Sequence, residues 1–158
     1  MSIERVREYM KKFNRTNDIM EFNVSSATVP LAAAALNTQE AKIAKSIALD
    51  VKGECIIVVV AGDAKLDNHK YKAYFHTKAK MLSAKETAER TGHAVGGVCP
   101  FALNDGVKVY LDVSMKRFDT VFPACGSANS AIELTCGELE KLSQNFTEWA
   151  DVCKEWQE

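Results

Sequence analysis

The sequence predicts a mixed α+β protein, with a sheet of six or seven strands and surrounding helices, folded as one domain over residues 1–158. Three observations favour this class. Amphipathic stretches of helical period alternate with β-rich runs. The run at residues 55–61 is apolar throughout, as in a central strand buried on both faces. A length of 158 residues suits one domain with a sizeable core.

Helices are predicted from apolar spacing and from capping residues. Thr28 and the serines before it can cap a helix whose first turn contains Pro30. Ser83 and Glu86 have the spacing of a capping box. The predicted helices span residues 2–14, 30–36, 39–44, 66–75, 84–90, 138–142 and 146–156.

Strands are predicted from β-rich runs bounded by turn residues. Lys52-Gly53-Glu54 is typical of a hairpin, and Asn104-Asp105-Gly106 is a strong turn signal. The predicted strands span residues 19–24, 46–51, 55–61, 80–82, 107–113, 120–124 and 132–135.

Composition and charge place the expected protein in the cytoplasm. The N-terminus lacks the apolar region of a signal peptide, and no apolar run approaches the ~20 residues that span a bilayer. Five scattered cysteines without a C-x-x-C motif favour free thiols in a reducing compartment. Residues 65–85 hold six lysines against one acid, Asp67. That lysine cluster suits either a solvated face or a nucleic-acid phosphate backbone.

The stretch Thr91–Phe101, Thr-Gly-His-Ala-Val-Gly-Gly-Val-Cys-Pro-Phe, is a candidate ligand loop. Glycine lets a ligand approach the backbone closely, and Pro100 would stiffen the end of the loop. A tight apolar connection within a core is the alternative interpretation. A short glycine motif does not separate the two.

The familiar catalytic signatures are absent from the sequence, which has no G-x-S-x-G elbow, no H-E-x-x-H and no phosphate-binding P-loop. The three histidines lack metal-ligand spacing, so neither a metal nor another cofactor is expected. Cys99 is either a thiol nucleophile or a small buried hydrophobe. Lys45, flanked by apolar residues, either extends to solvent or meets an anion.

Four pieces, taken together, resemble the YbaK/prolyl-tRNA synthetase-associated (INS-like) editing family, over about residues 20–142. The resemblance implies a free-standing, trans-acting member, because no synthetase catalytic domain accompanies it. It also implies a largely antiparallel, barrel-like sheet. The four pieces are Thr28-Val-Pro-Leu, Ala41-Lys-Ile-Ala-Lys45-Ser46, Gly92-His-Ala-Val-Gly96-Gly97-Val-Cys-Pro100 and Gly126-Ser127-Ala-Asn129.

What the resemblance implies is hydrolysis of amino acids wrongly esterified to tRNA. Lys45 corresponds to the family's functional lysine and would meet the phosphate of the terminal nucleotide. Gly96 and Gly97 would supply backbone N–H groups to the developing oxyanion. The implied partners are the acceptor end of a mischarged tRNA and, transiently, a synthetase. The expected substrate contacts are Thr28, Ser46, Val98, Pro100, Gly126, Ser127 and Asn129.

The amino acid removed is left open by the sequence. Alanine, serine, threonine and cysteine are candidates, with tRNA(Pro) as one candidate carrier. Ala131 stands where some bacterial relatives carry an acid, so a substrate contact through that carboxylate is not implied here. A non-catalytic module that binds aminoacyl-tRNA ends, or a similar small ligand, is the alternative function.

Overall fold

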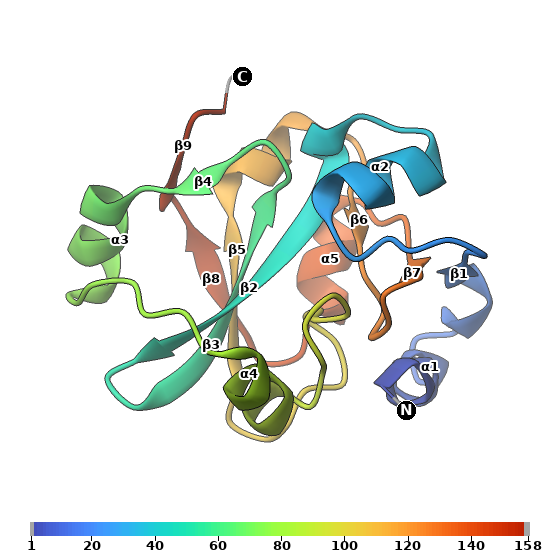
Figure 1. Cartoon of the computed structure of the whole chain (residues 1–158), viewed down its shortest axis with the longest axis horizontal. Helices are drawn as coiled ribbons and strands as arrows, with labels where there is room; N and C mark the ends of the chain where they lie inside the picture. The colour runs from blue at the N-terminus through green and yellow to red at the C-terminus, as the bar shows by residue number, and fades with distance from the viewer. Residues whose placement is uncertain (1, 157–158) are drawn as a thin grey trace.

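The computed structural model describes residues 2–156. Its main sheet is mixed, and its five strands lie in the order β6-β2-β3-β5-β8. The sheet crosses the middle of the molecule, with α3 (Asn68–Phe75) on one side of the view and α1 (Ser2–Lys11) and α2 (Val29–Leu36) on the other (Figure 1). The strands are β2 (Ile43–Val51), β3 (Glu54–Ala61), β5 (Lys108–Asp112), β6 (Phe122–Pro123) and β8 (Phe146–Ala150).

Strand direction corrects the predicted sheet, which was expected to have six or seven largely antiparallel strands. Within the five-stranded sheet of the described chain, only β2 and β3 pair in antiparallel fashion, through the predicted hairpin at Lys52 and Gly53. The other three pairings, β2 with β6, β3 with β5 and β5 with β8, are parallel. The strands of each parallel pair are separated by long stretches of chain, as crossover connections require. The remaining short strands form two-stranded sheets, β1 (Met20–Glu21) with β7 (Ser130–Ala131) and β4 (Lys65–Leu66) with β9 (Cys153–Lys154).

The helices that begin at capping residues lie close to their predicted positions. The Thr28 hydroxyl caps α2 by accepting from the Leu31 N–H. Ser83 and Glu86 form the predicted capping box of α4 (Ala84–Thr91). A second capping box, at Thr135, begins α5 (Cys136–Leu142) two residues before the predicted start.

The largest error in the predicted elements lies at the C-terminal end. Residues 146–156 were predicted as an amphipathic helix, but they contain β8 and β9. Phe146, Trp149 and Ala150 recur at helical spacing, yet β5 offers an unpaired edge, and pairing with it overrides the local pattern. Residues 39–44 were also predicted as a helix. They form a short 3-10 turn, η2 (Glu40–Lys42), followed by the start of β2.

Several predicted strands are shorter than expected because few of their residues find partners. Residues 80–82 touch β2 only through a bridge between Met81 and Leu49. Residues 132–135 contribute a bridge from Leu134 to Val121. The predicted helix at 66–75 is divided between β4 and α3.

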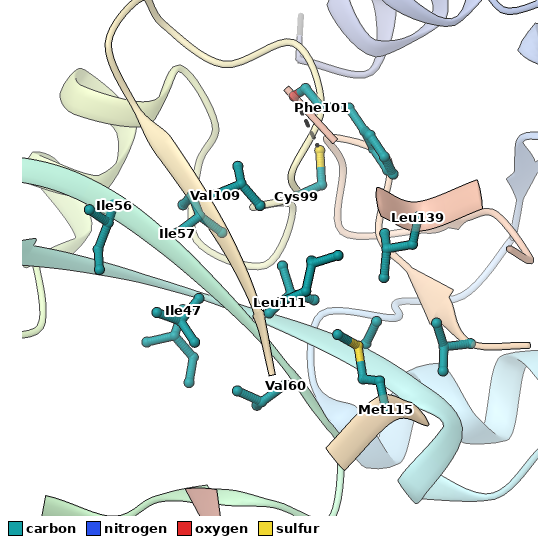
Figure 2. Close-up of a cluster of buried hydrophobic side chains, with 14 of the residues drawn as sticks. Ile47, Ile56, Ile57, Val60, Cys99, Phe101, Val109, Leu111, Met115 and Leu139 are labelled. Atoms are coloured by element: carbon teal, nitrogen blue, oxygen red, sulfur yellow. Dashed lines mark hydrogen bonds between the residues drawn. The ribbon is translucent and has the colours of Figure 1, made fainter. Parts of the chain in front are cut away.

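The main hydrophobic core lies between the sheet and the segments that follow β3. β3 is buried from Ile56 to Ala61, as its apolar sequence predicts. Figure 2 shows buried side chains of this core, which come from β2, β3 and β5, from α5 through Leu139, and from the glycine loop through Cys99 and Phe101. The loop Thr91–Phe101 is therefore anchored in the core at its C-terminal end.

A smaller apolar cluster attaches α2 to the sheet. Ala32 and Ala33 of α2 pack with Ile43 of β2 and Phe122 of β6. Alanines allow the helix axis to approach the strands closely, so α2 begins directly beside the first residues of β2. No helix within residues 2–156 is both long and apolar enough to cross a membrane.

Candidate functional site

A cavity of about 620 Å³ opens along β2. Its walls come from the start of α2, from residues 81–87, from the glycine loop and from β7. Most of the lining is apolar, and within the described chain its charged members are Lys45 and Glu40. The lining includes Ser26, Thr28, Val29, Pro30, Lys45, Ser46, Ala48, Met81, Leu82, Val95, Gly96, Val98, Ser130 and Ala131.

Lys45 lies on β2 opposite Val60 of β3, and its side chain is exposed. The ammonium group forms no ion pair or hydrogen bond with any group of residues 2–156. An unpaired ammonium group at an apolar cavity is available to an anionic ligand such as phosphate.

The glycine loop is the stretch Thr91–Phe101. It follows α4, which is capped at its C-terminal end by Gly92 with a φ of +90°. Gly96 lines the cavity with a φ of +95°, and a Cβ there would lie 3.2 Å from the Ala27 Cβ. No group in residues 2–156 accepts from the Gly96 or Val98 N–H. The Gly97 N–H, in contrast, donates to the Ala94 carbonyl at 3.0 Å. The N–H groups of Gly96 and Val98, two residues that line the cavity, are thus unpartnered in the described chain, whereas Gly97 closes a turn.

The second small-residue loop, residues 126–130, packs against the glycine loop Thr91–Phe101 at Gly97. A Cβ on Gly97 would lie 2.7 Å from both the Gly126 carbonyl carbon and the Ser127 nitrogen. Gly126, Ser127 and Asn129 lie outside the cavity lining, which this loop reaches through Ser130 and Ala131. The two loops could not pack so closely if Gly97 carried a side chain.

Side chains of the second loop hold the entrance to α2. The Asn129 amide donates to the Phe22 carbonyl at 3.0 Å, and the Phe22 N–H donates back to the Asn129 carbonyl. Within the loop, the Ser127 hydroxyl donates to Asn129 Oδ1, and its oxygen lies 2.7 Å from the Ser130 hydroxyl, from which it can accept. These bonds fix the segment that carries Ser26 and Thr28 into the cavity wall.

Helix α1 packs against the outer side of both loops. The Ser2 hydroxyl donates to the Gly92 carbonyl at 3.0 Å, and Arg5 Nη1 donates to the same oxygen at 3.3 Å. A Cβ on Gly126 would lie 2.7 Å from the Ser2 carbonyl oxygen and 2.9 Å from Val6 Cγ2. The N-terminal helix is therefore part of the scaffold of the cavity.

Cys99 and Pro100 face the core rather than the cavity. Cys99 is fully buried, and burial raises the pKa of its thiol to about 12. Its Sγ donates to the Phe101 carbonyl and lies 3.5 Å from His93 Nε2 (Figure 2 shows the bond to Phe101). The Pro100 carbonyl accepts from the Gln144 N–H. A fully buried thiol with so high a pKa stays protonated at neutral pH, so Cys99 packs in the core and is not a nucleophile.

His93 is buried, and its ring closes the base of the glycine loop. Its Nε2 lies 2.7 Å from the Phe101 carbonyl, and its Nδ1 has no partner among the described residues. Because a carbonyl can only accept, Nε2 carries the proton in the neutral ring. Burial lowers the pKa of His93 from its ordinary 6.5, since a charged ring would be poorly solvated there.

The lowered pKa of His93 predicts a loss of stability in acid. The unfolded chain binds this proton more readily than the folded chain, so stability rises with pH in this range. We expect the free energy of unfolding to be fully present above pH 6.5 and to fall as pH drops through the lowered pKa. Chemical denaturation between pH 5 and pH 8 measures the slope. His93→Gln should flatten it, whereas His69→Gln, at an exposed histidine, should keep it.

Several lining residues were not predicted from the sequence. Ser26, Glu40, Met81 and Leu82 all border the cavity. The Asp50 N–H donates to the Lys80 carbonyl, and the Leu82 N–H donates to the Ala48 carbonyl, which brings residues 80–82 onto β2. A Met-Leu pair among polar residues carries no periodicity that would indicate this contact.

The chain is similar to known proteins over most of its length. A family model for the aminoacyl-tRNA editing domain matches residues 24–142. The protein YwhH of Bacillus subtilis (strain 168) is 52% identical over 158 residues, covering 99% of this chain and 100% of its own.

Solved structures share the fold over nearly their whole length. A candidate trans-editing enzyme for prolyl-tRNA synthetase superposes with a TM-score of 0.86 at 25% identity, covering 97% of both chains. The hypothetical protein APE2540 superposes with a TM-score of 0.84 at 28% identity, covering 95% of this chain and 99% of its own. With three quarters of its length matched by the family model and the same fold in these relatives, the chain belongs to the aminoacyl-tRNA editing domain family.

Proposed function

We propose that this protein is a trans-acting aminoacyl-tRNA deacylase that removes small amino acids wrongly esterified to tRNA. Membership of the editing family supports a deacylase-type role, as does the likeness to a candidate trans-editing enzyme. The observation that carries the proposal is the cavity itself. It combines the unpaired ammonium group of Lys45 with the free N–H groups of Gly96 and Val98.

Lys45 is proposed to bind a phosphate of the 3′-terminal nucleotide. The acceptor end of tRNA carries one negative charge per nucleotide. Among the described residues that line the cavity, Lys45 is the one with a positive charge. Fixing the nucleotide holds the attached ester in one place, and such positioning contributes directly to rate.

The Gly96 and Val98 N–H groups are proposed to stabilise the oxyanion. Water adds to the ester carbonyl carbon, and the negative charge that develops on the carbonyl oxygen accepts hydrogen bonds from these donors. The carbon–oxygen bond to the ribose then breaks. The ribose oxygen leaves with a proton, and the amino acid departs as the free acid. Gly97 is proposed to hold the shape of the loop and not to bind the oxyanion, because its N–H already donates to the Ala94 carbonyl.

Selection is proposed to be steric, because synthetases separate small side chains poorly by binding alone. Thr28, Ser46 and Val98 line the cavity and are proposed to contact the substrate directly. Pro100, Gly126, Ser127 and Asn129 are proposed to act through the loops that they hold. Ala131, 3% exposed in the cavity wall, offers no charge to the substrate.

A deacylation screen tests the function. Purified protein is incubated with tRNAs charged with alanine, serine, threonine or cysteine, tRNA(Pro) among them, and with correctly charged controls. We expect rapid release of at least one small amino acid and slow release of large ones. Tight binding of charged tRNA without release from any member of the panel would instead support a non-catalytic binding module.

The lysine cluster of residues 65–85 divides into paired and unpaired members. Lys65 pairs with Glu155 at 3.3 Å, and Lys70 pairs with Asp151 at 3.1 Å. Lys78 and Lys80 are exposed and form no ion pair within residues 2–156, and they lie three residues and one residue before Met81 at the cavity. We therefore propose that Lys78 and Lys80 face the tRNA backbone.

Charge reversal at these positions should weaken tRNA binding. In Lys78→Glu/Lys80→Glu we expect affinity to fall about tenfold or more at 0.1 M salt, and the salt slope of binding to decrease by about two. Binding measured at several salt concentrations gives both quantities. Lys65→Glu/Lys70→Glu changes the same charge at paired positions and should bind like the wild type. Equal losses in the two variants would contradict this assignment.

A further inference from the structure

One edge of β2 is left partly open at the cavity. On the edge that faces away from β3, β6 pairs with Ile43 and Ala44, and residues 80–82 bond to Ala48 and Asp50. The stretch between these two contacts has no strand partner on that side within the described chain. Six consecutive residues, 43–48, line the cavity. Because side chains alternate between the faces of a strand, consecutive lining residues indicate that the cavity runs along the strand's edge.

The hydrogen-bonding pattern of β2 assigns the open position to Ser46. In an antiparallel pair, alternate residues direct their N–H and C=O groups toward the partner strand. The Asp50 N–H and the Ala48 carbonyl bond to residues 80–82, so the even-numbered residues point away from β3. Ser46 therefore directs its N–H and C=O into the gap. No group of residues 2–156 bonds to either of them there.

The Ser46 side chain is unpartnered as well. Its hydroxyl is buried without a hydrogen bond in the described chain, and the same holds for the hydroxyl of Ser26, which is 7% exposed. Both serines line the cavity. Buried polar groups are nearly always satisfied, and leaving one unpaired destabilises the protein. Unpaired polar groups in the wall of a cavity are typical of a ligand site.

We propose that the open edge of β2 at Ser46 binds the aminoacyl group as if it were one residue of an added strand. An aminoacyl ester carries the same pair of groups as a strand residue, an amino N–H donor and a carbonyl acceptor separated by one carbon. The Ser46 carbonyl accepts from the amino group, and the Ser46 N–H donates to the ester carbonyl. Strand addition of this kind is a common mode of peptide recognition.

This subsite rests on the proposed function for its ligand and deepens it. The two backbone bonds recognise what every amino acid has in common, so selection among side chains is left to the cavity walls. A carbonyl oxygen accepts two hydrogen bonds, so Ser46 and a donor of the glycine loop can share it. The mode requires a free amino group, and an N-acylated ester loses the donor that the Ser46 carbonyl needs.

Amide hydrogen exchange with a non-hydrolysable ligand tests the subsite. The probe is adenosine with alanine joined to its 3′ position through an amide in place of the ester. In the free protein, we expect the Ser46 amide to exchange at least about tenfold faster than that of Asp50, which lies on the same edge and is bonded to Lys80. Saturation with the probe should slow exchange at Ser46 by about tenfold and leave Asp50 unchanged.

A matched probe with an acetylated amino group should bind at least about tenfold more weakly. Equal affinity of the two probes, or binding without protection of Ser46, would overturn the subsite even if the protein deacylates tRNA. Protection of Ser46 by an unrelated tripeptide, with none by the probe, would overturn it in favour of peptide binding. Protection of Ser46 by the probe in a protein that cleaves no charged tRNA would sustain the subsite and refute the proposed deacylase.

Discussion

Lys45→Ala should lower kcat/KM for deacylation by about 100-fold or more. The variant removes the ammonium group proposed to hold the terminal phosphate, and misplacement of a reacting group by about 1 Å can cost a factor of this size. The side chain is exposed and unpaired within the described residues, so its removal leaves no buried group unsatisfied. Single-turnover deacylation of the best substrate from the screen measures the effect.

The control for Lys45 is a lysine of the same sheet that lies away from the cavity. Lys108 on β5 is exposed and lies 4.0 Å from Glu54. Lys108→Ala should deacylate at the wild-type rate, and both variants should unfold at the same denaturant concentration as the wild type. A Lys45→Ala enzyme with unchanged kcat/KM would remove the proposed role of this residue.

Gly97→Ala should damage both stability and activity, because the new methyl group has no room. Its Cβ would lie 2.7 Å from backbone atoms of Gly126 and Ser127, and backbone cannot rotate away as a side chain can. We expect the free energy of unfolding to fall by about 1–3 kcal/mol. We also expect at least a tenfold loss in kcat, since Gly96 and Val98 move with their neighbour. Denaturant titration and single-turnover kinetics measure the two effects.

Gly137→Ala is the matched control, with the same substitution made where space exists. The nearest atom to its Cβ would be Thr135 Oγ1 at 3.9 Å, and the residue lies inside α5. Because alanine favours helix over glycine, stability should rise by about 0.5–1 kcal/mol, with kcat unchanged. Retained activity in Gly97→Ala would show that the packing of the two loops does not position the donors.

The sequence predicts local structure well where a side chain acts on its own backbone. Thr28, and Ser83 with Glu86, cap helices in the positions expected of them. The β2–β3 hairpin follows from the turn at Lys52-Gly53. Strand partners are decided by segments far away in the chain, so neither the parallel pairings nor the fate of residues 146–156 could be deduced from local pattern.

The family resemblance is confirmed by the family match over residues 24–142. The site residues that it implied divide into two layers in the structure. Lys45, Gly96 and Val98 reach the cavity, whereas Gly97, Pro100 and the second loop lie behind it. The open edge at Ser46 could not be predicted, because it depends on where the pairing of β6 ends and the contact of residues 80–82 begins.

The parallel pairings of the sheet also bear on how the protein folds during synthesis. β2 is made early, but its partner β6 begins only at Phe122, and the cavity wall is complete only at Ala131. Helix α1 likewise forms its contacts with Gly92 and Gly126 only after those residues are made. Long-range pairings of this kind slow folding. In a growing chain, the apolar β2–β3 hairpin is therefore made well before β5, β6 and α5 can cover it, and apolar strands exposed in this way are prone to aggregate.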